Sequence, residues 1–118
     1  MSKKKRQVLP RFRVLLGDEI ALGPGKVDLL EQIAQTGSIV EAAQHMNMSY
    51  NRAWHLVHTM NECFKKPLVT AARGGRDGGG AALTETGARL LALYRRLEAE
   101  SNAATQDARR AIVALLKS

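Results

Sequence analysis

Apolar residues recur at helical spacing through the middle of the chain and predict three helices there. The first helix begins at about Lys26 and ends at Gly37, because glycine readily adopts the left-handed conformation that follows a helix. The second is short, and the third extends to about Phe64. The predicted apolar faces are Val27, Leu30, Ile33 and Ala34 in the first helix, Ile39, Ala42, Ala43 and Met46 in the second, and Ala53, Leu56, Val57, Met60 and Phe64 in the third.

Serine residues mark the starts of the second and third helices. Ser38 is followed three residues later by Glu41, which is the spacing of a capping box, and Ser49 precedes the third helix. Only a few residues around Asn47 separate the two helices, and asparagine tolerates the positive φ that such a turn needs. A connection this short makes two helices cross steeply, which predicts a helix-turn-helix. The residues expected to hold its packing are Ala43, Asn47, Ala53 and Trp54.

Two pairs of short strands flank these helices. The expected strands are residues 11–16 and 19–22 in an N-terminal hairpin, and residues 68–70 and 81–83 in a second hairpin. The tip of the second hairpin, residues 73–80, is rich in glycine. A hairpin that follows a helix-turn-helix is a wing, so the middle of the chain predicts a winged helix-turn-helix.

A last helix is predicted from Thr84, which is placed to cap it, to the end of the chain. Gly87 is the only glycine in this stretch, and there is no proline. One helix over 84–118 is longer than a small core can cover, so part of its apolar face is expected to pack against a second copy. The alternative is that the helix folds back on its own domain. The residues expected in dimerisation are Leu90, Tyr94, Leu97, Ala104 and Ala108.

The predicted fold class is therefore mainly α with a small β component. Its expected parts are a basic, flexible arm over residues 1–10, a winged helix-turn-helix domain over residues 11–83 and a long dimerisation helix over residues 84–118. A length of 118 residues agrees with a single domain.

The net charge of the chain indicates a class of binding partner. The chain carries 18 lysines and arginines against 11 aspartates and glutamates, a net charge of +7. Polyanions are the leading partner class for such a chain. Aromatic residues make up only 4%, which leaves little for stacking single-stranded bases, so double-stranded DNA is the expected partner. The basic arm either adds nonspecific phosphate contacts or is a solvated tail.

Other classes of function have little support. The chain has one cysteine, no apolar run of membrane-spanning length and no secretory signal, so a cytoplasmic location is expected. The sequence has no paired-carboxylate motif and no nucleophile motif, so an enzyme is not expected, and no cofactor is expected. His55, His58 and Cys63 do not share one helix face, so no metal site is expected and a metal-responsive sensor is a weak alternative.

The third helix is the predicted recognition helix, because its first turns carry polar side chains that can reach base edges. Arginine favours guanine there and asparagine favours adenine. Two arginines in the glycine-rich tip are expected to contact the DNA backbone or the minor groove. The candidate DNA-binding residues are Ser49, Tyr50, Asn51, Arg52, His55, Arg73 and Arg76. Trp54 could also reach DNA, but a tryptophan at this position is expected to pack under the wing or against the N-terminal hairpin.

Several motifs occur in a fixed order along the chain. They are GlyProGlyLys at 23–26, AlaGlnThrGlySerIle at 34–39, SerTyrAsnArgAlaTrp at 49–54, MetAsn at 60–61, GlyGlyArgAspGlyGlyGlyAla at 74–81 and LeuThrGluThrGly at 83–87. Together they resemble the N-terminal winged-helix domain of the molybdate-responsive ModE regulators, which is itself similar to LysR-type DNA-binding domains. The resemblance extends from about Phe12 to Glu98. It implies a dimeric transcription regulator that contacts DNA with its third helix and its wing.

One feature of that family has no counterpart in the motifs. Full-length ModE regulators carry C-terminal repeats that bind molybdate or tungstate, and the predicted helices and wing occupy this sequence as far as Ser118. A molybdate-binding domain is therefore not expected in these 118 residues.

A different class of function stays open beside DNA binding. A winged helix can also bind a partner protein through its third helix without reading DNA sequence. Salt dependence separates the two, because a protein that neutralises DNA phosphates releases counterions and loses affinity steeply as salt rises.

Overall fold

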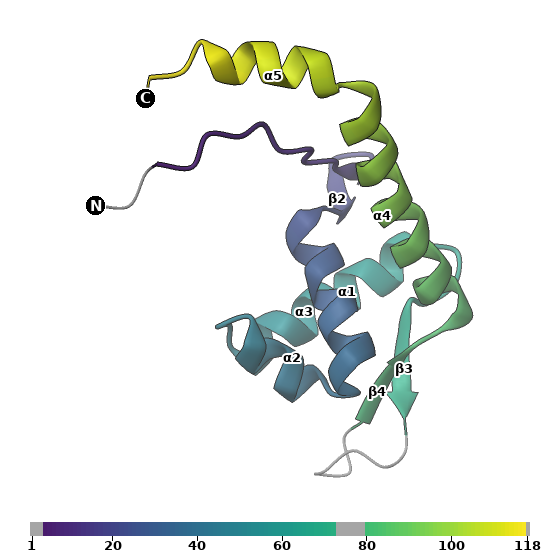
Figure 1. Ribbon diagram of the computed structural model, residues 1–118. Coiled ribbons are helices and arrows are strands. Elements are labelled where there is room, and N and C mark those ends of the chain that lie inside the picture. The colour runs from purple at the N-terminus through teal and green to yellow at the C-terminus, as the bar shows by residue number, and fades with distance from the viewer. Residues whose placement is uncertain (1–3, 73–79, 118) are drawn as a thin grey trace.

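The structure is a computed structural model that describes residues 4–72 and 80–117 (Figure 1). It confirms a mainly helical winged helix-turn-helix with two antiparallel strand pairs. In chain order the elements are β1 (Val14–Leu16), β2 (Glu19–Leu22), α1 (Pro24–Thr36), α2 (Ile39–His45), α3 (Tyr50–Cys63), β3 (Val69–Ala72), β4 (Gly80–Leu83), α4 (Glu85–Ala104) and α5 (Gln106–Ala114).

Helix α1 lies at the centre of the fold and packs against α2, α3, α4 and β4. It begins earlier than predicted, at Pro24, because the fixed φ of proline suits the first turn of a helix. Gly37 ends it with a φ of 71°, as expected. The buried face is wider than the predicted stripe: Leu29 is buried and Ala34 is exposed, since several elements pack around this helix.

The turn between α2 and α3 has the predicted geometry. Ser38 Oγ accepts a hydrogen bond from the Glu41 N–H at 3.2 Å, and Ser49 Oγ accepts one from the Arg52 N–H at 3.1 Å. Asn47 has a φ of 54° and is the one non-glycine residue of the described chain with a positive φ. The two small residues at the crossing, Ala43 and Ala53, are 2% and 0% exposed, so the helices approach closely.

The wing is a two-stranded antiparallel hairpin in which Val69 pairs with Leu83 and Ala72 pairs with Gly80. Its strands are longer than predicted, and the Ala81 N–H bonds to the Gly37 carbonyl at 2.9 Å. This bond fixes β4 to the connection between α1 and α2. Arg73 and Arg76, predicted to contact DNA from the tip, lie outside the described residues.

The prediction of a single helix over 84–118 is wrong, because the structure has two helices, α4 and α5, divided at Thr105. Thr105 Oγ1 donates a hydrogen bond to the Ser101 carbonyl at 2.6 Å, and the Arg109 Nε donates to Thr105 Oγ1 at 3.1 Å. Serine, threonine and asparagine side chains compete with the backbone for such bonds and weaken a helix interior. The chain turns here, so α5 leaves the line of α4 (Figure 1).

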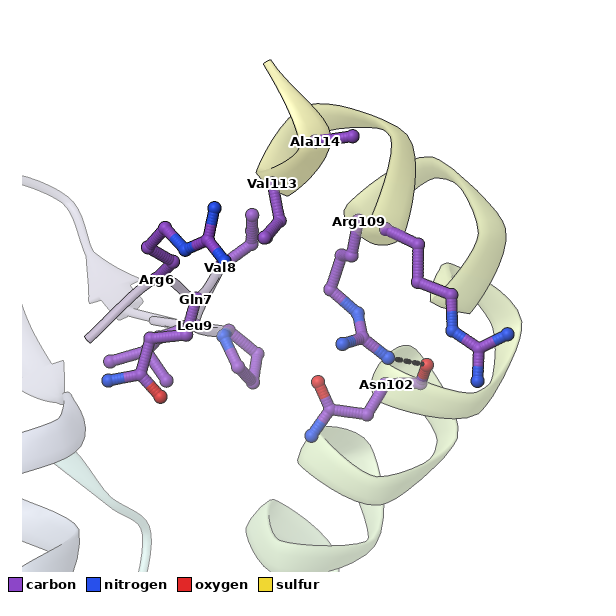
Figure 2. A pocket seen from close by; sticks show the side chains of 10 residues that line it. Arg6, Gln7, Val8, Leu9, Asn102, Arg109, Val113 and Ala114 are labelled. Carbon is purple, nitrogen blue, oxygen red and sulfur yellow. Dashed lines mark hydrogen bonds between the residues drawn. The ribbon is translucent and has the colours of Figure 1, made fainter. Parts of the chain in front are cut away.

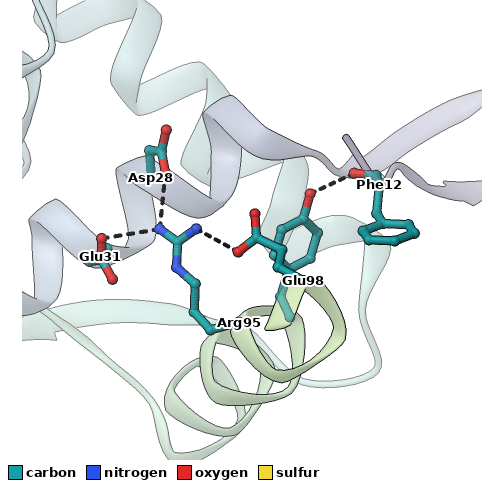
Figure 3. Close-up of polar contacts among 6 residues, drawn as sticks. Phe12, Asp28, Glu31, Arg95 and Glu98 are labelled. Carbon is teal, nitrogen blue, oxygen red and sulfur yellow. Dashed lines mark hydrogen bonds and ion pairs between the residues drawn. The ribbon is translucent and has the colours of Figure 1, made fainter. Parts of the chain in front are cut away.

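Two residues anchor the middle of α4 to the rest of the domain (Figure 3). The Tyr94 hydroxyl donates a hydrogen bond to the Phe12 carbonyl at 2.6 Å. The Arg95 guanidinium bonds to Asp28 and Glu31 of α1 at 3.0 Å and to Glu98 at 2.9 Å. Burial lowers the pKa of Arg95, but its hydrogen bonds to the three carboxylates outweigh that effect and raise the pKa above its ordinary value.

This anchoring corrects part of the predicted dimerisation face. Tyr94 is 3% exposed and Leu90 is half-buried, and both pack against the core of their own chain. Periodicity places residues on one face of a helix but does not say which surface covers that face. Leu97 is 42% exposed, and Ala104 and Ala108 are also exposed.

We expect Tyr94→Phe to lower the free energy of unfolding by about 1 kcal/mol, because the ring stays and the hydrogen bond to Phe12 is lost. Burial raises the pKa of Tyr94 above its ordinary value of 10.0, so the folded protein holds the phenol proton more tightly than the unfolded chain. The contribution is complete below the unfolded-state pKa and is lost as pH rises through the folded-state pKa. Urea unfolding of the wild type and of Tyr94→Phe at neutral and alkaline pH measures both effects. If the free energy of unfolding falls equally in the two proteins between neutral and alkaline pH, the predicted pH dependence is wrong.

Candidate nucleic-acid interface

The first two turns of α3 present a cluster of exposed side chains at the end of the molecule that also holds α2 and the wing. The structure brings together the five predicted contact residues of this helix, and all of them are exposed: Ser49, Tyr50, Asn51, Arg52 and His55. Asn51 and His55 are one turn apart and share a face. The opposite face of α3 is buried through Ala53, Val57 and Met60, so the helix is fixed while its polar side is free.

Tyr50 and Trp54, also one turn apart, border a groove between α3 and the wing. The groove has a volume of about 540 Å³, and its lining includes Ile39 and Val40 from the start of α2 and residues of β3 and β4. Trp54 is 42% exposed. The expectation that it packs under the wing is therefore only partly met: the ring faces the groove and stacks on His58, with centroids 5.0 Å apart and planes at 7°.

Asn61, near the end of α3, connects this helix to the wing. Its Oδ1 accepts hydrogen bonds from the N–H groups of Leu68 and Val69 at 2.8 and 3.1 Å, and its Nδ2 donates to the Val69 carbonyl at 3.1 Å. The sequence analysis assigns Asn61 no role, although Asn61 belongs to one of the motifs that resemble ModE regulators. Through these three bonds, one side chain sets the position of the wing relative to α3.

A second hollow lies between the described part of the arm and the α4–α5 bend (Figure 2). It has a volume of about 700 Å³ and is lined by Arg6, Val8 and Leu9 of the arm and by residues around Arg109. The Arg109 guanidinium donates to the Asn102 carbonyl and to Thr105 Oγ1, so it stabilises the bend. The arm and α5, which carry most of the residues that line this hollow, lie at the end of the molecule away from the wing (Figure 1), so the hollow is separate from the candidate interface.

Residues 25–88 match the model of a family described as bacterial regulatory helix-turn-helix proteins of the lysR family. The chain belongs to this family. The matched segment includes α2, α3 and both wing strands, so family membership covers the whole candidate interface. Within the described residues, no helix is both long and apolar enough to cross a membrane.

Relatives of this LysR-type domain include regulators with names related to molybdenum. The chain is 45% identical over 84 residues to the molybdenum transport protein ModE of Azotobacter vinelandii, covering 71% of this chain and 31% of that protein. It is 40% identical over 79 residues to the DNA-binding transcriptional dual regulator ModE of Escherichia coli K12, covering 67% and 30%. The resemblance inferred from the motifs is thus confirmed. The chain spans about a third of the length of these relatives.

Solved structures agree on the fold. A complex of the CbnR DNA-binding domain with DNA superposes with a TM-score of 0.59 at 17% identity, covering 75% of this chain and 95% of that one. Full-length LysG of Corynebacterium glutamicum with bound arginine gives a TM-score of 0.54 at 24% identity, covering 73% and 29%. These similarities confirm a LysR-type winged helix-turn-helix fold.

Proposed function

We propose that this protein is a sequence-specific DNA-binding transcriptional regulator that contacts the major groove with α3 and the backbone or minor groove with the wing. The observation that carries this proposal is the free polar side of α3 on a helix whose other side is fixed in the core. A recognition helix needs both features, because its side chains must reach base edges from a set position. A structurally similar domain, the CbnR DNA-binding domain, was solved in complex with DNA, which supports DNA binding by this fold.

The proposal covers this chain and not the whole of its longer relatives. The similarity to ModE spans only about a third of those proteins, and the elements described here belong to the winged helix and the segment after it. We therefore propose DNA binding without a molybdate response for these 118 residues. The chemistry proposed is noncovalent recognition, with no role as an enzyme.

The test begins with selection of bound sequences from random duplex DNA by the purified protein. On the selected site, Arg52→Ala should weaken binding by about 5-fold to 150-fold, with a smaller effect on random DNA, because a base contact is lost. The matched control is Arg13→Ala: Arg13 is an exposed arginine beside the N-terminal hairpin, outside α3, the wing and α4. This control should leave binding unchanged.

Salt titration distinguishes the proposal from a protein-binding winged helix. Affinity for duplex DNA should fall steeply with salt, since each neutralised phosphate releases counterions. Failure to bind any duplex in a salt-dependent manner would overturn the proposed function. Equal losses for Arg52→Ala on selected and random DNA would instead show that Arg52 contacts only phosphate.

A further inference from the structure

The groove between α3 and the wing has an unusual surface for a basic protein. Among the described residues, none of those lining the groove is charged, although the chain carries a net charge of +7. Three large side chains at its edge stay well exposed: Val40 at 39%, Tyr50 at 48% and Trp54 at 42%. Exposed apolar side chains that form one contiguous patch mark contact surfaces, whereas singly scattered ones do not.

The position of the groove restricts what can cover it. Trp54 lies on the same two turns of α3 as Asn51 and His55, so the apolar edge continues directly from the polar side proposed to face the bases. A DNA strand that passes from α3 toward the wing must cross this groove. A phosphate there would meet no cation from the described lining, so the groove favours an apolar part of the strand.

The bases offer one apolar group in the major groove, the C5-methyl group of thymine. We propose that Trp54 and Val40 form an apolar surface that contacts thymine methyl groups and so adds thymine to the sequence that the protein reads. The inference rests on the proposed DNA binding and names a specificity determinant within it. Trp54 stacks on His58 with ring centroids 5.0 Å apart, a contact that favours one orientation of the indole and so suits recognition of a single methyl group.

The experiment replaces each thymine of the selected site by deoxyuridine, which removes only the methyl group. One or two positions should bind about 3-fold to 4-fold more weakly per methyl lost, the effect expected for burying one such group. Trp54→Ala should bind the thymine and deoxyuridine sites equally. Val40→Thr, which keeps the shape of the side chain and replaces a methyl group by a hydroxyl, should reduce the difference.

Asn51→Ala is the matched control on the same helix. It should weaken binding to both DNAs while leaving the thymine-to-deoxyuridine ratio unchanged. If the wild type binds with normal salt dependence and no position distinguishes thymine from deoxyuridine, the proposal is overturned and DNA binding stands. A ratio that persists in both Trp54→Ala and Val40→Thr also overturns it. Absence of salt-dependent binding to any duplex removes the proposed function and this inference together.

Discussion

Gly87→Ala is expected to destabilise the protein by about 2–3 kcal/mol, even though alanine is the better helix former. Gly87 is in the first turn of α4, where that helix crosses the start of the wing. A Cβ atom added to Gly87 would lie 2.1 Å from the Leu68 carbonyl oxygen and 3.0 Å from its carbon. Both atoms belong to the backbone of a buried residue, so no side-chain rotation can relieve the overlap.

The position of Leu68 makes this clash costly. Its carbonyl already accepts a hydrogen bond from the Thr84 N–H at 2.9 Å, and its own N–H donates to Asn61 at 2.8 Å. Moving the carbonyl away from an alanine at 87 would break the bonds that connect α3, the wing and α4. The cost of overpacking therefore exceeds the roughly 1 kcal/mol that alanine gains over glycine in a helix.

Gly25→Ala is the matched control for this prediction. Gly25 is also in the first turn of a helix, α1, but a Cβ atom there would meet nothing within 4 Å. The control should be neutral or more stable by up to about 1 kcal/mol, since alanine reduces the entropy of the unfolded chain. Urea unfolding of both variants measures the difference. Similar stabilities for the two would show that α4 can shift away from the wing at little cost.

The features that the sequence predicted well are local ones. Ser38 and Ser49 cap the helix that follows each of them, and Asn47 adopts a positive φ, because each depends on residues within a few positions. The polar start of α3 could be predicted for the same reason. Once the turn is placed, the helix numbering decides which residues face outward.

Other features depend on contacts between distant segments and could not be read from periodicity. From the sequence, Gly87 is a glycine that the first turn of a helix tolerates, and only the structure shows that the Leu68 backbone leaves no room for a Cβ atom there. Tyr94 fits an apolar stripe for a partner chain, yet its hydroxyl bonds to Phe12, 82 residues earlier. The groove beside Trp54 needs α2, α3 and the wing together, so no single stretch of sequence predicts it.

Removal of residues 99–118 is expected to shift the protein from dimer to monomer and to weaken operator binding about 100-fold. We propose that two copies associate through the exposed apolar residues of α4 and the segment after it. Those on α4 are Leu93 and Leu97, which are one turn apart, and those that follow are Ile112, Leu115 and Leu116. Because Tyr94 faces its own core, the proposed partner meets the adjacent side of α4, which keeps Leu97 of the predicted stripe and adds Leu93.

The expected loss of affinity follows from the two-fold symmetry of such a dimer. Two linked recognition helices read two half-sites, and the second contact forms at high effective concentration, which is worth 10²-fold or more. The truncated chain keeps the Arg95 ion pairs with Asp28, Glu31 and Glu98, so its winged helix should stay folded. Thermal unfolding of the truncated chain checks this point.

Leu97→Glu tests the same interface without shortening the chain. It should give a monomer, because it places a charge in the proposed contact, while the fold is retained since Leu97 is 42% exposed. Leu15→Glu is the control: Leu15 is 61% exposed on the N-terminal hairpin, outside α4 and α5, and should leave the dimer intact. Light scattering at tens of micromolar measures the molar mass of the wild type, of Leu97→Glu and of Leu15→Glu. A wild type that is monomeric there, or a Leu15→Glu variant that dissociates while Leu97→Glu does not, would contradict dimerisation through α4 and α5.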